Sequence, residues 1–249
     1  MIRGLYTAGL GMMKETKRMD VISNNLANVN TTAFKADGVV SGNFSDVLQN
    51  VTLGGTPMDS RDYVPDVDKV FTKYEQGSMV NTSNDTDFGI INDDTAFFEI
   101  VDPDGNVFYT RDGSFKISAD GYLVTSDGYT VMGENGSINV GQEEFTVSEL
   151  GEIIDKNGDT IDKFSIKSFA EKERIEKVGN NMVKVPDDIE AKNFEGGIKQ
   201  GFLESSNVNS VEEMVDMIAV MRSYEANQKI LQAHDQLLEK SVNQLGSLS

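Results

Sequence analysis

Few residue types in this chain could carry out chemistry, and none of them stands in a pattern typical of a catalytic site. The 249 residues include no cysteine and a single histidine, His234. Without cysteine the chain has no disulfide, no thiolate zinc site and no cysteine nucleophile. General acid–base chemistry would require His234 beside a nucleophile and an orienting acid. We interpret it as a solvated or interface residue, because it occupies a polar position of an expected helix.

Carboxylates are abundant, but their spacing does not predict a site. The run from Asp155 to Asp159 resembles the start of a calcium loop. An EF-hand loop requires glycine at its sixth position and glutamate at its twelfth. Here Gly158 is fourth, so we interpret the run as a hairpin turn. No spacing singles out a carboxylate pair suited to glycoside hydrolysis. We therefore expect no catalytic, metal or cofactor site.

The charge of the chain excludes several classes of partner. The formal net charge is -19, and such a surface repels nucleic acid and anionic lipid headgroups. No run of about 18 apolar residues occurs, so no membrane insertion is expected. The N-terminus shows neither a signal-peptide core nor a cleavage site. The protein is therefore expected to be cytoplasmic, or exported by a route that leaves the N-terminus uncut.

Residues 3–28 are expected to form the first of two long helices. Apolar and small side chains recur there at alternating spacings of three and four, which is a heptad seam. Gly9 and Gly11 each cost a helix about 1 kcal/mol relative to alanine. Because Gly9 lies in the seam, we interpret it as a point of close approach by a neighbouring helix; a frayed helix is the alternative. Asparagines and threonines over 28–32 predict the helix end.

Residues 211–245 are expected to form the second long helix, with the same spacing. Ser210 and Glu213 fit a capping box, in which the serine accepts a backbone hydrogen bond and the glutamate reaches back. Gly246 ends the pattern. The methionines of this segment are typical of an interhelical core, with a promiscuous binding face as the alternative.

Neither helix buries its apolar stripe alone, and isolated helices are marginally stable in water. We therefore expect the two helices to pack on each other and on copies from other chains. The residues expected at this assembly interface are Leu5, Gly9, Met12, Met19, Leu26, Met214, Met217, Met221, Tyr224, Leu231, Leu238, Val242 and Leu245.

The middle of the chain is typical of β structure. Short alternating runs at 97–101, 107–110, 114–117 and 122–124 are separated by acid–glycine pairs about eight residues apart, which is a strong hairpin signal. Further strands are expected around 145–147, 152–154 and 164–166. Residues 36–85 show no clear period and are expected to form an extended connector, a strut ordered by neighbouring subunits.

Four segments together resemble the rod and hook family of bacterial flagellar axial proteins. They are the runs 26–35, 109–115 with 120–124, 201–209 and 222–227, in the family's order and over nearly the whole chain. The residues that carry the resemblance are Asn28, Asn30, Thr31, Thr32, Phe34, Arg111, Asp112, Gly113, Asn207, Asn209, Arg222, Tyr224 and Glu225. The resemblance is greatest to the proximal- or distal-rod members, since a hook protein usually carries a further outer domain.

The resemblance implies an α+β fold and a structural role. Long terminal helices over 1–35 and 205–249 would pair as a coiled-coil-like bundle and polymerise as the inner tube. The connector would span 36–85, and a central domain of short antiparallel strands would span 86–204. The protein would be a non-enzymatic rod subunit of the basal body that transmits torque from motor to hook, outside the cytoplasmic membrane in the periplasm or cell-wall zone. Its partners would be itself, other rod proteins, the hook and the flagellar type III export apparatus.

Three other functions remain as alternatives. The chain would be a hook or hook-basal-body-like axial subunit of the same family, a wall-cutting hydrolase, or a cytoplasmic coiled-coil adaptor. A hydrolase predicts convergent polar groups in a pocket, and the sequence offers no such cluster. An adaptor does not explain why the two seams lie at opposite ends of the chain and flank a β domain.

Overall fold

A computed structural model describes residues 2–40, 69–141, 144–179, 181–186, 188–192 and 194–246. These residues form two compact units. The first, the helical unit, comprises residues 2–27, 37–40, 69–71 and 209–246. The second, the β unit, comprises 28–36 and the described residues of 72–208. The fold is therefore α+β, with two terminal helices in contact and a central region of short antiparallel strands, as predicted.

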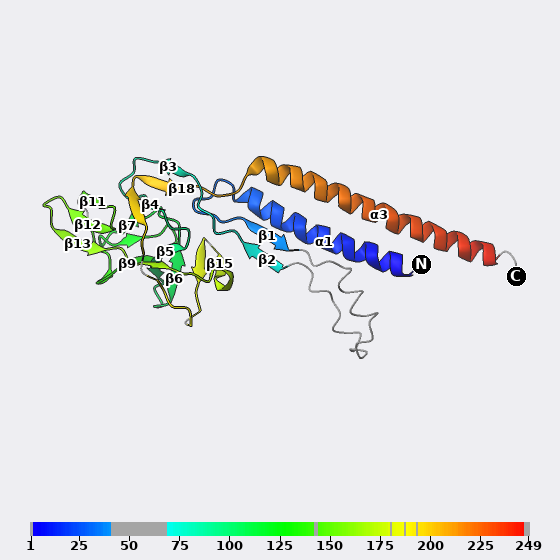
Figure 1. Cartoon of the computed structure of the whole chain (residues 1–249), viewed down its shortest axis with the longest axis horizontal. Coiled ribbons are helices and arrows are strands. Elements are labelled where there is room, and N and C mark those ends of the chain that lie inside the picture. The colour runs from blue at the N-terminus through cyan, green and yellow to red at the C-terminus, as the bar shows by residue number, and fades with distance from the viewer. Residues whose placement is uncertain are drawn as a thin grey trace. The chain divides into compact units, whose positions relative to one another are not determined.

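The helical unit consists of two long helices and a strand pair. Helix α1 spans Ile2–Ala27 and α3 spans Ser210–Gly246, and strands β1 (Asp37–Val40) and β2 (Lys69–Thr72) pair with each other. The helices lie side by side (Figure 1). They run antiparallel, because Gly4 lies against His234, Gly11 against Asn227, and Asn25 Nδ2 donates to Glu213 Oε1 at 3.0 Å. No described helix is long and apolar enough to cross a membrane.

The contact between α1 and α3 has the predicted heptad spacing but a different register. On α3 the less exposed side chains after Ser210 are Glu213, Met217, Val220, Tyr224, Asn227, Leu231 and His234. On α1 the contact runs through Gly4, Ala8, Gly11, Glu15, Arg18, Ile22 and Asn25, one residue before the expected seam. The physical reason is the size of the side chains, because small residues at the first three positions admit a neighbouring helix.

Among the described residues, no neighbouring helix makes the close contact expected at Gly9. A Cβ built on Gly9 meets nothing within 4 Å, whereas a Cβ on Gly4 would lie 2.7 Å from His234 Nε2. A Cβ on Gly11 would lie 2.9 Å from Asn227 Nδ2. The glycines that permit close approach are therefore Gly4 and Gly11, and His234 is a half-buried contact residue of α3.

The end of α1 and the start of α3 both lie close to the predicted positions. Helix α1 ends at Ala27, before the predicted stop at Asn28. Helix α3 is capped by Asn209, whose Oδ1 accepts from the backbone N–H groups of Val211 (3.2 Å) and Glu212 (3.4 Å). The cap predicted at Ser210 is therefore wrong by one residue, because an asparagine side chain can make the same bonds from the preceding position.

The β unit is built around one nine-stranded antiparallel sheet. Its main path is β15 (Glu176–Gly179), β16 (Met182–Lys184), β6 (Val107–Thr110), β5 (Ala96–Val101), β9 (Thr130–Gly133), β8 (Leu123–Val124) and β7 (Lys116–Ile117), with β10 (Gly136–Ser137) on β9 and β14 (Ile166–Ser168) on β5. Strands β11 (Phe145–Val147), β12 (Glu152–Asp155) and β13 (Thr160–Lys163) form a second sheet. Strand β17 (Gly197–Gln200) pairs with β4 (Phe88–Ile91), and β18 (Phe202–Glu204) with β3 (Met79–Asn81). A 3-10 turn, η1, spans Lys172–Arg174.

Most of the predicted turns are confirmed. Gly105, Gly121, Gly128 and Gly158 have φ between 85° and 89°, a left-handed conformation that glycine adopts without steric cost. Each closes a tight connection between neighbouring strands, including the Asn157–Gly158 turn between β12 and β13.

The hairpin predicted at Asp112–Gly113 is wrong. Strands β6 and β7 do not pair with each other; β6 lies between β5 and β16, and β7 pairs with β8. Gly113 instead passes close to β4, where a Cβ would lie 1.8 Å from the Phe88 carbonyl oxygen. The glycine is there because two backbones cross closely, which is the other common use of this residue.

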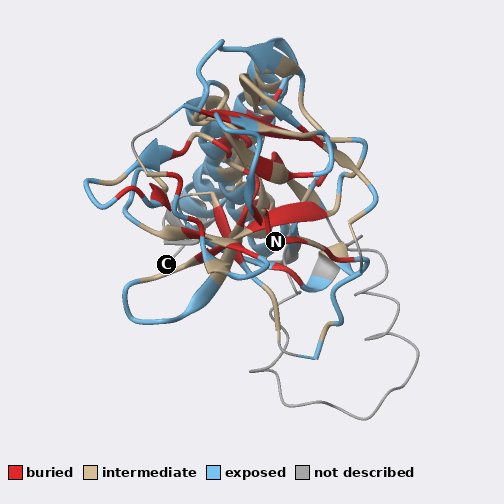
Figure 2. Ribbon diagram, turned by 90° about the vertical axis from the view of Figure 1, so that its left-hand side faces the viewer, coloured by how far each residue is buried: buried red, intermediate tan, exposed pale blue. Residues whose placement is uncertain are grey.

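Phenylalanine rings fill the core of the β unit. Phe88, Phe98, Phe115 and Phe164 are buried and contact one another at centroid distances of 5.1 to 6.5 Å. A second buried cluster contains Tyr74, Phe97 and Phe169. Figure 2 shows buried residues concentrated along the strands, whereas the helices are largely exposed or intermediate.

The boundaries of the predicted domains do not coincide with those of the two units. Residues 28–36 lie in the β unit, and the predicted connector contains β1, β2 and β3. Its residues 41–68 lie outside the described chain. The division at residues 35, 85 and 204 stays a prediction for the assembled protein.

Candidate functional site: a buried ion cluster and an exposed helix face

Three of the expected motif segments meet at a buried ion cluster in the β unit. Lys35 is the last residue of the first motif segment, Arg111 lies just after β6, and Glu204 ends β18. Lys35 Nζ pairs with Glu204 Oε1, and Arg111 Nε donates to Glu204 Oε2 at 2.6 Å. All three side chains are almost completely buried. Segments far apart in sequence are therefore joined by charge at one point.

Backbone groups complete the cluster. Lys35 Nζ also donates to the carbonyl oxygen of Glu75 at 2.7 Å, and Arg111 Nη1 donates to that of Ala96 at 2.8 Å. Glu204 Oε1 accepts a further bond from the Gly77 N–H at 2.8 Å. Arg111 Nη2 is buried without a hydrogen-bond partner in the described chain. One carboxylate thus pairs directly with two buried cations.

The electrostatics follow from this imbalance. Burial lowers the pKa of Lys35 below its ordinary 10.5; the Glu204 carboxylate opposes that shift and the Arg111 guanidinium adds to it. Removing one member of a buried ion pair costs about 3–5 kcal/mol, because the remaining charge is left uncompensated. The cluster therefore holds backbone segments in place, and its charged groups are enclosed rather than presented to a substrate.

Polar side chains of the motifs reinforce the same junction. Asn207 Oδ1 accepts from the Ala36 N–H at 2.7 Å, and its Nδ2 donates to the carbonyl oxygen of Lys73 at 2.8 Å. Asn181 Nδ2 donates to the Thr32 carbonyl at 2.6 Å. The Ala33 N–H donates to the Glu204 carbonyl at 2.8 Å. Phe34 packs with Ala36 and Val208 in a small apolar cluster.

The remaining motif residues either make hydrogen bonds within their own segment or are exposed. Asn28 Oδ1 accepts from Thr31 Oγ1 at 3.2 Å, and Asp112 Oδ1 accepts from the Ser114 N–H at 3.0 Å. Asn30, Arg222 and Glu225 are exposed.

Sequence reasoning missed two members of the ion cluster. Lys35 and Glu204 stood in the motif segments but were not selected as site residues. A signal was available for Lys35, since a charged residue between Phe34 and Ala36 interrupts an apolar run and must be either exposed or paired.

Helix α3 carries an exposed apolar face, which we call the α3 stripe. It consists of Val211, Met214, Val215, Ile218 and Met221, at the spacing of one helix face, and Val211 and Val215 are 65% and 60% exposed. Contiguous exposed apolar patches are typical of interaction surfaces.

The residues expected at the assembly interface fall into two groups: those half-buried on the helices and those that are exposed. Met217, Tyr224 and Leu231 face α1, and Met12, Met19 and Leu26 are half-buried. Leu5, Met214, Met221 and Leu238 are exposed. The side chains of Val242 and Leu245 lie outside the described residues. That these residues mediate assembly stays a prediction.

Sequence profiles of three flagellar families match this chain in order. "Flagella basal body rod protein" matches residues 5–35, "Flagellar hook protein FlgE/F/G D1 domain" matches 91–195, and "Flagellar basal body rod FlgEFG protein C-terminal" matches 199–245. The ion cluster takes Lys35, Arg111 and Glu204 from these three matched regions in turn.

Known proteins are similar over nearly their whole length. The flagellar basal-body rod protein FlgG of Borreliella burgdorferi is 36% identical, over 96% of this chain and 97% of that protein. The flagellar basal-body rod protein FlgF of Rhizobium meliloti is 31% identical over 98% of each. The flagellar hook-basal body complex protein FlhO of Bacillus subtilis is 28% identical over 100% of each. The profile matches and these relatives show that the chain belongs to the flagellar basal-body rod protein family. Members of this family are structural and non-enzymatic.

Proposed function

We propose that the chain is a structural subunit of the flagellar rod, polymerising through its terminal helices into a helical tube that transmits torque from motor to hook. The α3 stripe carries this proposal. The stripe remains exposed although α3 already packs on α1, so pairing within the chain leaves apolar surface for another contact. Fully burying one such side chain contributes about 1.5–3 kcal/mol, and in a polymer every subunit repeats the contact.

The proposed partners follow from membership of the family. They are further copies of the chain, other rod proteins, the hook and the flagellar type III export apparatus. The proposed location is the basal body outside the cytoplasmic membrane, in the periplasm or cell-wall zone, reached by export without cleavage of the N-terminus. The net charge of -19 supports the absence of nucleic acid and of membrane insertion from this list.

A hook-basal-body-like axial subunit is the second candidate function. It is favoured by the likeness to FlhO, which extends over the whole of both chains. Labelling the chain in isolated hook–basal bodies and imaging them by electron microscopy separates the two. Label within the rod supports the first candidate, and label at the hook or its junction supports the second.

Disrupting the α3 stripe tests the proposal directly. Met214→Asp with Ile218→Asp puts two charges on the exposed stripe without altering the face that contacts α1. The variant should remain soluble with an unchanged unfolding midpoint, while cells that produce it lose rods and motility. Glu239→Lys, another exposed change on the same helix, is the control and should be mild. Normal rods from the double variant would contradict polymerisation through this face.

A further inference from the structure

Two exposed charged pairs on the helices form no ion pair with the residues that the structure describes. Lys17 and Asp20 lie three residues apart on α1, and Arg222 and Glu225 lie three residues apart on α3. All four side chains are exposed, and none forms an ion pair in the part of the chain that the structure describes. Arg222 and Glu225 are also motif residues that neither the ion cluster nor the α1–α3 contact uses.

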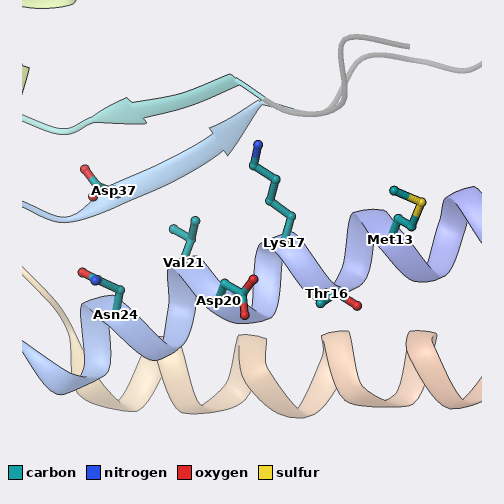
Figure 3. Close-up of a pocket in the computed structure, with 7 residues that line it drawn as sticks. All are labelled: Met13, Thr16, Lys17, Asp20, Val21, Asn24 and Asp37. Carbon is teal, nitrogen blue, oxygen red and sulfur yellow. The ribbon is translucent and has the colours of Figure 1, made fainter. Parts of the chain in front are cut away.

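Lys17 and Asp20 line an open groove of about 490 Å³ between α1 and β1. Figure 3 shows Met13, Lys17, Asp20 and Val21 along α1 on this groove, with Asp37 on β1 opposite. The groove residues lie on a different face of α1 from Ala8, Gly11 and Ile22, which mark the contact with α3. Each helix of the unit thus presents a second face, apart from the α1–α3 contact, to which the described residues assign no helix partner.

The two charged pairs are complementary when the helices run antiparallel. An alignment that places Lys17 opposite Glu225 also places Asp20 opposite Arg222, since in both pairs the positive residue stands three positions before the negative one. The same alignment places Val21 opposite Met221, so the last residue of the α3 stripe meets an apolar residue of the groove. It places Ile218 opposite the polar Asn24. Parallel alignment places unlike charges opposite each other at only one of these positions at a time.

Antiparallel alignment is also the one that a directional polymer requires. Within one chain, α1 and α3 run antiparallel. If all copies point the same way along a tube, α1 of one copy therefore also runs antiparallel to α3 of the next copy. The groove and the stripe are different surfaces, so their contact is heterologous, and a heterologous contact whose rotation does not close builds an open helical filament.

We propose that the α1–β1 groove of one copy receives α3 of a second copy, with Lys17 facing Glu225 and Asp20 facing Arg222. The proposal rests on the proposed function and names the partner surfaces for it. The apolar contacts of Val21 with Met221 supply affinity, and the charged pairs fix the register, because like charges opposed across an interface are strongly unfavourable.

Cysteine cross-linking tests the pairing on a clean background, since the chain has no cysteine of its own. Cells are made to produce two full chains, one with Val21→Cys and the other with Met221→Cys, and isolated basal bodies are oxidised gently. A disulfide-linked dimer of the two chains is expected. Val211→Cys in place of Met221→Cys is the matched control: the position is on the same exposed stripe but about 15 Å away along the helix, and it should link poorly.

Charge exchange tests the register independently. Lys17→Glu and Glu225→Lys should each reduce the amount of chain in basal bodies at least about tenfold. The double variant should restore most of it. Basal bodies that contain the chain but give neither the specific cross-link nor the rescue would overturn this pairing and leave the proposed function standing. Absence of the unaltered chain from rods and hooks alike would overturn both.

Discussion

The two units of this molecule are stabilised in different ways. In the β unit, rings such as Phe88 and Phe98 are completely buried, and even the charged groups of Lys35, Arg111 and Glu204 are enclosed and paired. In the helical unit, Val220 is the only buried side chain among the described residues of α3, while the α3 stripe is exposed. The β unit therefore completes its core within one chain, whereas the helical unit presents apolar surface that the described residues of the chain leave exposed.

This difference shows where stability and assembly reside. Changes in the β unit should act on the folding of a single chain, and changes on the helices should act on association. The following predictions test that separation, beginning with the largest expected effect on the stability of the β unit.

Phe98→Ala should destabilise the β unit by about 4 kcal/mol, because a large buried ring is replaced by a cavity. Urea unfolding followed by β-type circular dichroism and tyrosine fluorescence measures the change. Val178→Ala, at a side chain that is 51% exposed, is the control and should change the free energy of unfolding by no more than about 0.5 kcal/mol. Similar midpoints for the two variants would show that the core is not closed around Phe98.

Glu204→Gln should cost the β unit about 3 kcal/mol, because it removes the carboxylate that pairs directly with the buried cations Lys35 and Arg111. Glu195→Gln makes the same chemical change at an exposed position and should have little effect. An equally mild Glu204→Gln would mean that the cluster does not hold the motif segments together.

The pH dependence of Glu204→Gln should reveal Lys35. Its pKa is lowered in the folded chain, so between that value and 10.5 the unfolded chain binds more protons and stability rises with pH. In Glu204→Gln the carboxylate that opposes the shift is gone, so the pKa of Lys35 is lowered further. The pH window then extends to lower pH, and stability rises more steeply with pH. Urea midpoints measured from about pH 8 upward should show the slope. Adding Lys35→Met should remove it, and an unchanged slope would exclude Lys35 as its source.

Gly113→Ala should destabilise the β unit more than Gly105→Ala, although both glycines stand in similar acid–glycine pairs. A Cβ at Gly113 would lie 1.8 Å from the Phe88 carbonyl oxygen, so backbone must shift, at a cost of about 2 kcal/mol. Gly105 has open space around it and φ of 89°, so alanine there costs about 1 kcal/mol of backbone strain. Thermal melts of the two variants decide the order, and the reverse order would contradict the close crossing at Gly113.

Leu231→Asp with Leu238→Asp should leave the unfolding midpoint of the β unit unchanged, within about 0.5 kcal/mol. Leu231 faces α1 and Leu238 is 40% exposed, and both lie outside the β unit. The same variant should abolish rod assembly and motility. A large loss of β-unit stability would show that the two units do not fold independently.

Local patterns predicted much of this fold. The heptad spacing predicted α1 and α3 to within one or two residues. Three acid–glycine pairs and Asn157–Gly158 predicted four of the turns, because both kinds of pattern depend on neighbours in sequence. The misses depend on tertiary contacts. Asp112–Gly113 has the composition of a hairpin, but Gly113 serves the crossing with β4.

The candidate site was predicted only in part for the same reason. The motif segments contained Lys35, Arg111 and Glu204, yet their meeting point depends on how β18 and the segment after α1 return to β6. Likewise, the spacing of α1 fits two adjacent registers, and the absence of side chains at Gly4 and Gly11 selects the one that contacts α3.

Hydrogen exchange of the backbone amides, compared between the dilute chain and the assembled rod, tests the central claim most directly. Amides of β5 and β6 should be strongly protected in both states, because the β unit is complete in one chain. Amides over residues 211–221 should exchange fast in the dilute monomer and become protected only in the rod. Equal and strong protection of 211–221 in a proven monomer would contradict the account, since the helical unit would then need no partner to be stable.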